Sequence, residues 1–98
     1  MRKSETAIET LIRREERRAE GISYAYELSM RERMGVNGAR IPLYSISVRM
    51  TDSRGNSTAA SSNDLFADAG KAILFFDKLV SGLATPIDLA YVVEDEMR

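Results

Sequence analysis

The pattern of apolar and polar positions has two different periodicities along the chain. From residue 22 to 31, and again from 44 to 51, apolar and polar side chains alternate strictly. A period of two predicts strands that bury one face and expose the other. The buried faces are expected to consist of Ile22, Tyr24, Tyr26, Leu28 and Met30 in the first strand and of Tyr44, Ile46, Val48 and Met50 in the second.

Turn-forming residues separate these strands. Gly35, Asn37, Gly38 and Pro42 predict a loop between them, and residues 52–56 predict a turn in which Gly55 takes a positive φ. A short third strand is predicted over residues 57–62 and would pair with the second strand as a hairpin. It lacks bulky side chains, and such an edge strand can accept a partner strand.

After residue 68 the apolar spacing changes to that of an α-helix. Asp68 is the expected N-cap of a first helix, which ends at Gly82. Thr85 followed by Pro86 predicts the start of a second helix. The apolar stripes are Ala69, Ala72, Ile73, Phe76, Leu79, Val80 and Leu83 in the first helix and Leu89, Val92, Val93 and Met97 in the second.

The first twenty residues are rich in charge and predict a helix. Thr6 and Glu9 fit a capping box, Gly21 fits a helix stop, and Glu15 and Arg18 are spaced to pair on a helix. The sequence therefore predicts a charged helical N-terminal extension (1–20) and a single α+β domain (21–98). The expected fold has an N-terminal helix, a three-stranded antiparallel meander and a C-terminal α-helical hairpin packed on one face.

The C-terminal motif resembles a family signature. The stretch from Thr85-Pro86 through Leu89 to Val92-Val93-Glu94-Asp95 is similar to the Ser/Thr-Pro-x-x-Leu…Val-x-Glu-Asp ending of a family of small uncharacterised bacterial proteins. The upstream order of two alternating strands, a short third segment and a helix is similar as well. The resemblance covers residues 22–97 and implies a domain of unknown function, with no catalytic residue to carry over.

Composition excludes many common kinds of chemistry. The 98 residues contain no Cys and no His, which removes thiolate nucleophiles, zinc-thiolate sites and the commonest general base. The acidic residues 94–96 splay around a helix and are expected to face solvent rather than hold a metal. We therefore expect no enzyme activity, no catalytic residue, no cofactor and no metal site.

The same sequence predicts a cytoplasmic protein. No apolar run approaches the length of a membrane span, and the N-terminus does not read as a secretory signal. The net charge of −1 offers no attraction to an anionic membrane. We expect no membrane association.

Arginines are the candidate binding residues. The candidate set is drawn from the N-terminal segment and from the outer face of the sheet, and consists of Arg13, Arg14, Arg17, Arg18, Arg31 and Arg49. Interleaved glutamates cancel much of the local charge, and the helical hairpin (63–98) carries three basic and seven acidic residues, which disfavours nucleic acid. The leading hypothesis is a non-catalytic protein-interaction or self-association module. The alternative is a weak nucleic-acid-associated accessory protein that uses the Arg-rich N-terminal helix.

Overall fold

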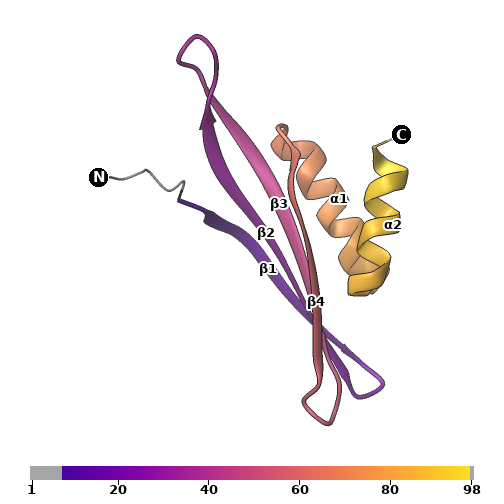
Figure 1. Cartoon of the computed structure of the whole chain (residues 1–98). Coiled ribbons are helices and arrows are strands. Elements are labelled where there is room, and N and C mark those ends of the chain that lie inside the picture. The colour runs from indigo at the N-terminus through magenta and orange to yellow at the C-terminus, as the bar shows by residue number, and fades with distance from the viewer. Residues whose placement is uncertain (1–7, 98) are drawn as a thin grey trace.

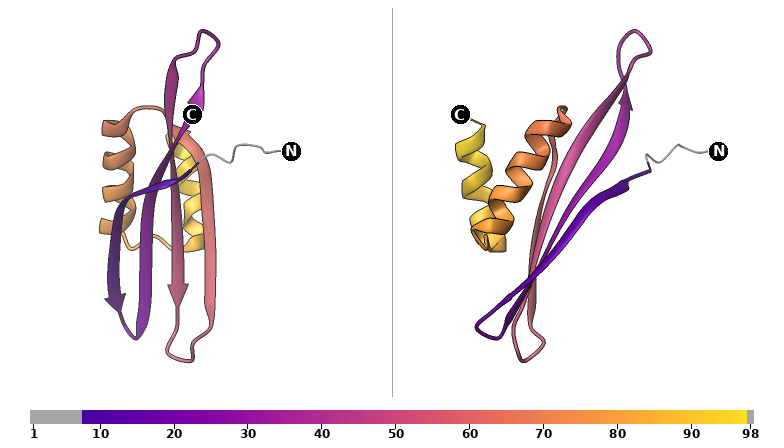
Figure 2. Two further views of the ribbon diagram at one scale, coloured as in Figure 1. Left: turned by 90° about the vertical axis from the view of Figure 1, so that its left-hand side faces the viewer. Right: turned by 180° about the vertical axis from the view of Figure 1, so that it is seen from behind.

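A computed structural model describes residues 8–97 and shows an α+β fold (Figure 1). Four strands are followed by two helices. Their bounds are β1 (Thr10–Ala19), β2 (Ile22–Met34), β3 (Arg40–Thr51), β4 (Ser57–Phe66), α1 (Ala69–Ser81) and α2 (Pro86–Glu96). The strands form one antiparallel sheet in the order β1-β2-β3-β4, and both helices lie against the same face of it (Figure 2).

The predicted N-terminal helix is wrong, because residues 10–19 form strand β1. Ala19 pairs with Ile22, so the connection is a two-residue hairpin loop made of Glu20 (φ 53) and Gly21 (φ 79). Positive φ at both central residues is the geometry of a type I′ turn, which suits the twist of paired strands. Gly21 therefore turns a hairpin rather than stopping a helix. The predicted boundary at residue 20 falls in this loop, and the predicted cap at Thr6 lies outside the described residues.

The three-stranded sheet is also wrong, since β1 adds a fourth strand beside β2. The predicted strand at 57–62 exists but continues to Phe66 through an irregularity in its pairing with β3. Asp64 has a φ of 55 there, so the strand bends without ending. Pro42 lies in β3 rather than in a loop, opposite Glu32 of β2.

The core forms where the alternating strands meet the helices. Val48 and Phe76 are fully buried, and Tyr24 is half-buried against the core that they belong to. The predicted mating of two apolar faces is therefore confirmed. The buried apolar residues are Tyr26, Leu28, Tyr44, Ile46, Val48, Ala72, Phe75, Phe76, Leu79, Val80, Ala84 and Leu89.

The helix caps confirm the local sequence signals. The Asp68 carboxylate accepts from the backbone N–H groups of Gly70 (2.8 Å) and Lys71 (3.3 Å). Thr85 and Asp88 form a reciprocal capping box around Pro86. These bonds satisfy N–H groups that have no partner within the helix.

A buried hydrogen bond joins the sheet to the connection between the helices. The Tyr26 hydroxyl, on β2, donates to the carbonyl of Ala84 at 2.9 Å. This bond gives the tyrosine a partner in the core and anchors the turn between α1 and α2.

The sheet extends well beyond the helices. The radius of gyration of 15.1 Å exceeds the roughly 12.6 Å expected for a compact domain of this length. Figure 1 shows the β2–β3 hairpin projecting at one end and the other two hairpins at the opposite end. One face of the sheet and both of its edge strands are therefore accessible for contacts.

Candidate functional site

The four arginines of β1 do not form one cluster. Side chains of a strand alternate between faces, so Arg14 and Arg18 lie on the open face of the sheet, while Arg13 and Arg17 lie on the helix side. A helix would have placed neighbouring arginines on adjacent positions of one surface. The strand divides them instead.

On the helix side, both arginines are engaged within the molecule. Arg13 pairs with Asp77 of α1 at 2.8 Å and so links an edge strand to a helix. Arg17 donates to the Glu15 carboxylate at 3.1 Å and to the Glu16 carbonyl at 2.8 Å. These contacts explain the two residues without an external ligand.

On the open face, Arg14 is compensated by two carboxylates. It pairs with Glu16 at 2.6 Å and with Glu27 of β2. The hydrogen bonds that Arg14 donates to Glu16, and then to Glu27, raise the pKa of Arg14. Both partners stabilise the guanidinium charge and leave little of it for another anion.

Arg31 crosses the open face to reach β4. Its guanidinium binds both carboxylate oxygens of Asp64, with Nε 3.0 Å from Oδ1. The ion pair lowers the pKa of Asp64 and raises that of Arg31. The backbone N–H of Asp64 donates to the buried Ser45 hydroxyl at 2.9 Å, which positions the carboxylate for this pairing.

Arg18 and Arg49 are the candidates that the structure brings together without an acidic partner. They line a shallow hollow of about 310 Å³ on the open face, together with Ser23 and Thr51. In the part of the chain that is described, neither guanidinium has a carboxylate within 4.0 Å. The Glu16 carboxylate lines the same hollow and pairs with Arg14.

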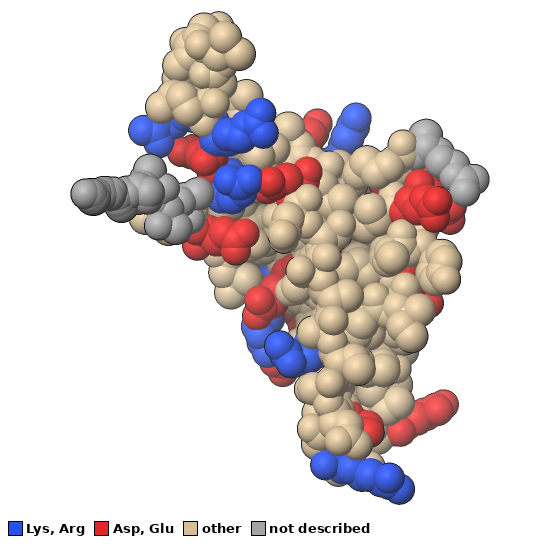
Figure 3. Space-filling view, in the orientation of Figure 1, with Lys and Arg blue, Asp and Glu red and all other residues tan. Residues whose placement is uncertain are grey.

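The charge pattern on the surface agrees with this division. In Figure 3, basic and acidic side chains are interspersed along the sheet side of the molecule, and the projecting hairpin tip is uncharged. A nucleic-acid interface needs a continuous basic surface. Of the six predicted arginines, Arg13, Arg14, Arg17 and Arg31 form separate ion pairs, whereas Arg18 and Arg49 share one hollow.

The edges of the sheet differ sharply in composition. Strand β1 carries six charged side chains in ten residues, whereas the run from Ser57 to Asn63 in β4 carries none and contains no proline. Charges and prolines on an edge strand discourage pairing with other chains. The segment predicted as a weak edge is therefore the less protected of the two edges.

Sequence reasoning missed a groove at the open end of the helical hairpin. Its walls include Leu65, Phe66 and Phe75, none of which was assigned a role. A signal was present, because Lys71, Phe75 and Lys78 recur at spacings that place them on one side of a helix. What the sequence could not show was that the end of β4 lies beside them.

Two further observations concern metal and membrane. Within residues 8–97, no group of three or more Asp and Glu side chains is arranged to hold a metal ion. None of the described helices is long and apolar enough to cross a membrane.

Comparison with known proteins gives one match. A model of a family of unknown function, DUF6514, matches residues 5–98. No curated protein and no solved structure gives a significant match to the chain.

Proposed function

Because the chain belongs to DUF6514, a family of unknown function, we propose its function from its own geometry: it is a non-catalytic self-association module in which β4 pairs with β4 of a second copy. The observation that carries this proposal is the uncharged edge from Ser57 to Asn63. Figure 2 shows no described element beyond the outer edge of β4 in its left-hand view. The backbone groups on that edge need a partner or water.

The edge is complementary to itself. A two-fold axis perpendicular to the sheet makes the two β4 strands antiparallel and keeps each face on its own side. Centred on Ala60, this pairing sets Ala59 opposite Ser61 of the second copy. The small side chains of the run leave the approach of two backbones unobstructed. The product is an eight-stranded sheet with the helices of both copies on one face.

The absence of catalysis in the proposal is supported by the available chemistry. With no His and no Cys in the sequence, general-base and nucleophilic roles fall to carboxylates, lysines and hydroxyls. Most carboxylates of the described residues already form an ion pair, as Asp64 does, or a helix cap, as Asp68 does. Contact between chains needs only an unpaired strand edge, and β4 provides one among the described residues.

The nucleic-acid alternative has less support, because β1 divides its arginines between two faces and glutamates pair with several of them. Binding of RNA or DNA with a log–log salt slope of about −4, lost when Arg13, Arg14, Arg17 and Arg18 become Ala, would favour that alternative.

Sedimentation velocity over a concentration series tests the self-association. We expect the natural chain to convert from monomer to dimer as its concentration rises into the micromolar range. The double variant Ala59→Lys/Ser61→Lys sets like charges opposite each other across the two-fold axis and should weaken the dimer at least about tenfold. Both positions are exposed on the open face, so the core is left intact.

Thr10→Lys/Leu11→Lys is the matched control. It adds the same charge to the exposed start of β1 and should leave the dimer unchanged. A natural chain that stays monomeric to about 1 mM contradicts the proposal, as does equal weakening by both double variants. Circular dichroism verifies folding, and Ala59→Glu with Ser61→Glu repeats the test with the opposite charge.

A further inference from the structure

The groove at the open end of the helical hairpin has the size of a small-molecule site. Helices α1 and α2 meet at the turn of residues 82–85 and diverge from it (Figures 1 and 2). Between their far ends and the end of β4 lies a groove of about 660 Å³. Sites that hold small ligands range from about 300 to 1,000 Å³.

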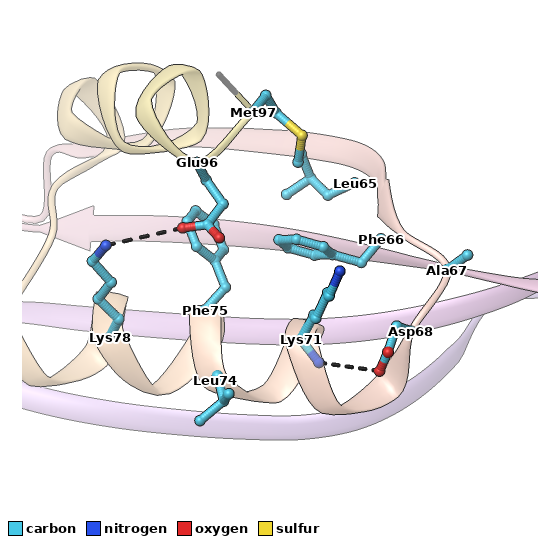
Figure 4. Close-up of a pocket in the computed structure, with 10 residues that line it drawn as sticks. All are labelled: Leu65, Phe66, Ala67, Asp68, Lys71, Leu74, Phe75, Lys78, Glu96 and Met97. Carbon is cyan, nitrogen blue, oxygen red and sulfur yellow. Dashed lines mark hydrogen bonds and ion pairs between the residues drawn. The ribbon is translucent and has the colours of Figure 1, made fainter.

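The base of this groove is apolar. Phe66 of β4 packs against Phe75 of α1, with ring centroids 5.4 Å apart and planes inclined by 60°. Leu65 is half-buried, and Leu65 and Met97 also line the groove (Figure 4). Phe75 is buried in the core, so an apolar ligand body placed here would cover the half-buried Phe66 and Leu65.

The charges around the groove leave one cation without an acidic partner. Asp68 accepts the backbone N–H groups at the start of α1, and the Glu96 carboxylate lies 4.0 Å from the Lys78 ammonium. Lys71 has no carboxylate within 4.0 Å among residues 8–97. Lys71 and Phe66 both line the groove, and Figure 4 shows the Lys71 side chain directed into it from α1.

We propose that this groove binds a small anionic amphiphile, such as a medium-chain alkyl carboxylate, with its apolar body on Leu65 and Phe66 and its carboxylate on the Lys71 ammonium. The ligand anion supplies the charge that Lys71 lacks, and the chain covers the exposed part of the apolar base. This site is separate from the β4 edge and does not depend on the proposed self-association.

Three probes of equal chain length test the proposal: octanoate, 1-octanol and octylammonium, each below its micellar concentration. In ¹⁵N-resolved NMR titrations of the whole chain, octanoate should shift the amides of residues 65–75. A hydrogen bond between charged groups favours the anion, so octanoate should bind about tenfold more tightly than octanol, and octylammonium more weakly than both.

Lys71→Met keeps an apolar side chain and removes the ammonium. In this variant octanoate should lose its advantage over octanol, while the affinity for octanol stays the same. Arg54→Met is the matched control, because it removes the same charge from the exposed turn between β3 and β4.

Four results overturn the proposal. They are equal affinity for all three probes in the natural chain, absence of octanoate binding, shifts confined to residues outside the groove, and octanoate selectivity that survives Lys71→Met. The NMR spectrum of each variant reports its folding directly, and Lys71→Gln serves as a second neutral variant.

Discussion

At the residue scale, Tyr26 connects the two layers of the molecule. Its ring is fully buried in the sheet–helix core, and its hydroxyl reaches the Ala84 carbonyl in the turn between the helices. Burial, followed by the neighbouring Tyr24 hydroxyl, raises the pKa of Tyr26 to about 12. The folded state therefore holds this proton more tightly than the unfolded chain does.

Tyr26→Phe should destabilise the protein by about 1–2 kcal/mol at neutral pH, because it leaves the Ala84 carbonyl without its buried donor. A raised pKa in the folded state stabilises the fold below the unfolded value of 10.0, and this contribution is lost as the pH rises towards 12. Urea unfolding at neutral pH and above pH 10 measures both effects. A variant with the natural stability and the natural alkaline profile would contradict this role.

Asp64 of β4 forms an ion pair with Arg31 of β2, and this pair reaches across β3 on the open face of the sheet. Asp64→Asn should be less stable than the natural chain near neutral pH. Since Arg31 lowers the folded-state pKa of Asp64 below its ordinary 3.8, the ion pair's contribution is present above that value and is lost as the pH falls through the lowered pKa.

The difference between the natural chain and Asp64→Asn should therefore shrink in acid. Thermal unfolding from neutral pH to about pH 2.5 measures it. Arg31→Gln should remove the same pH-dependent part, and the double variant should add little to either single change. Independent, additive effects of the two changes would show that the pair does not act as a unit.

At the element scale, the β1–β2 hairpin decides how the first twenty residues are used. Opposite charges alternate on each face of β1, with Arg14, Glu16 and Arg18 on the open face. Glu15 and Arg17 pair at a spacing of two residues, as neighbours on one strand face do. The same charged residues also place opposite charges three and four positions apart, a spacing that stabilises a helix. The tight turn resolves the ambiguity.

Gly21→Ala should destabilise the protein by about 1–2 kcal/mol, because Gly21 has a φ of 79 and a side chain there is strained even in open space. Gly82→Ala is the control. Its φ of −88 suits any residue, so its stability should change by less than about 0.5 kcal/mol. Urea unfolding compares the two. Equal costs would show that the positive φ of the turn is not what Gly21 provides.

At the scale of the whole molecule, the sheet is larger than its helical cover. Two helices shield one face, while the other face stays polar and carries the ion pairs of Arg14 and Arg31. Edge strand β1 is charged, whereas the run from Ser57 to Asn63 in edge strand β4 is not. The two edges of the sheet therefore differ in charge, and this difference is the basis of the proposed association through β4.

Hydrogen–deuterium exchange should report this polarity. Raising the protein concentration from about 5 µM to about 500 µM should slow amide exchange in residues 57–63, because pairing buries the free edge, while exchange in β1 stays the same. Peptide-level mass spectrometry measures both strands in one experiment. Protection of β1 instead of β4 would contradict the proposal, because it would place the association at the charged edge.

The sequence allowed many residues of the candidate site to be predicted, but not how these residues are arranged in space. The six arginines and the weak edge strand were identifiable from the sequence, and the groove was not. Phe66 and Phe75 are nine residues apart and belong to different elements, so their packing depends on how α1 folds back onto the sheet. Local periodicity carries no information about that distance.

By itself, the sequence determined the alternating strands at the centre of the sheet, both C-terminal helices and their caps, because burial of one face and capping of free N–H groups are local requirements. Only the tertiary structure decided that residues 10–19 form a fourth strand. Their charged pattern is compatible with either a helix or a strand, and pairing with β2 supplies the hydrogen bonds that select the strand.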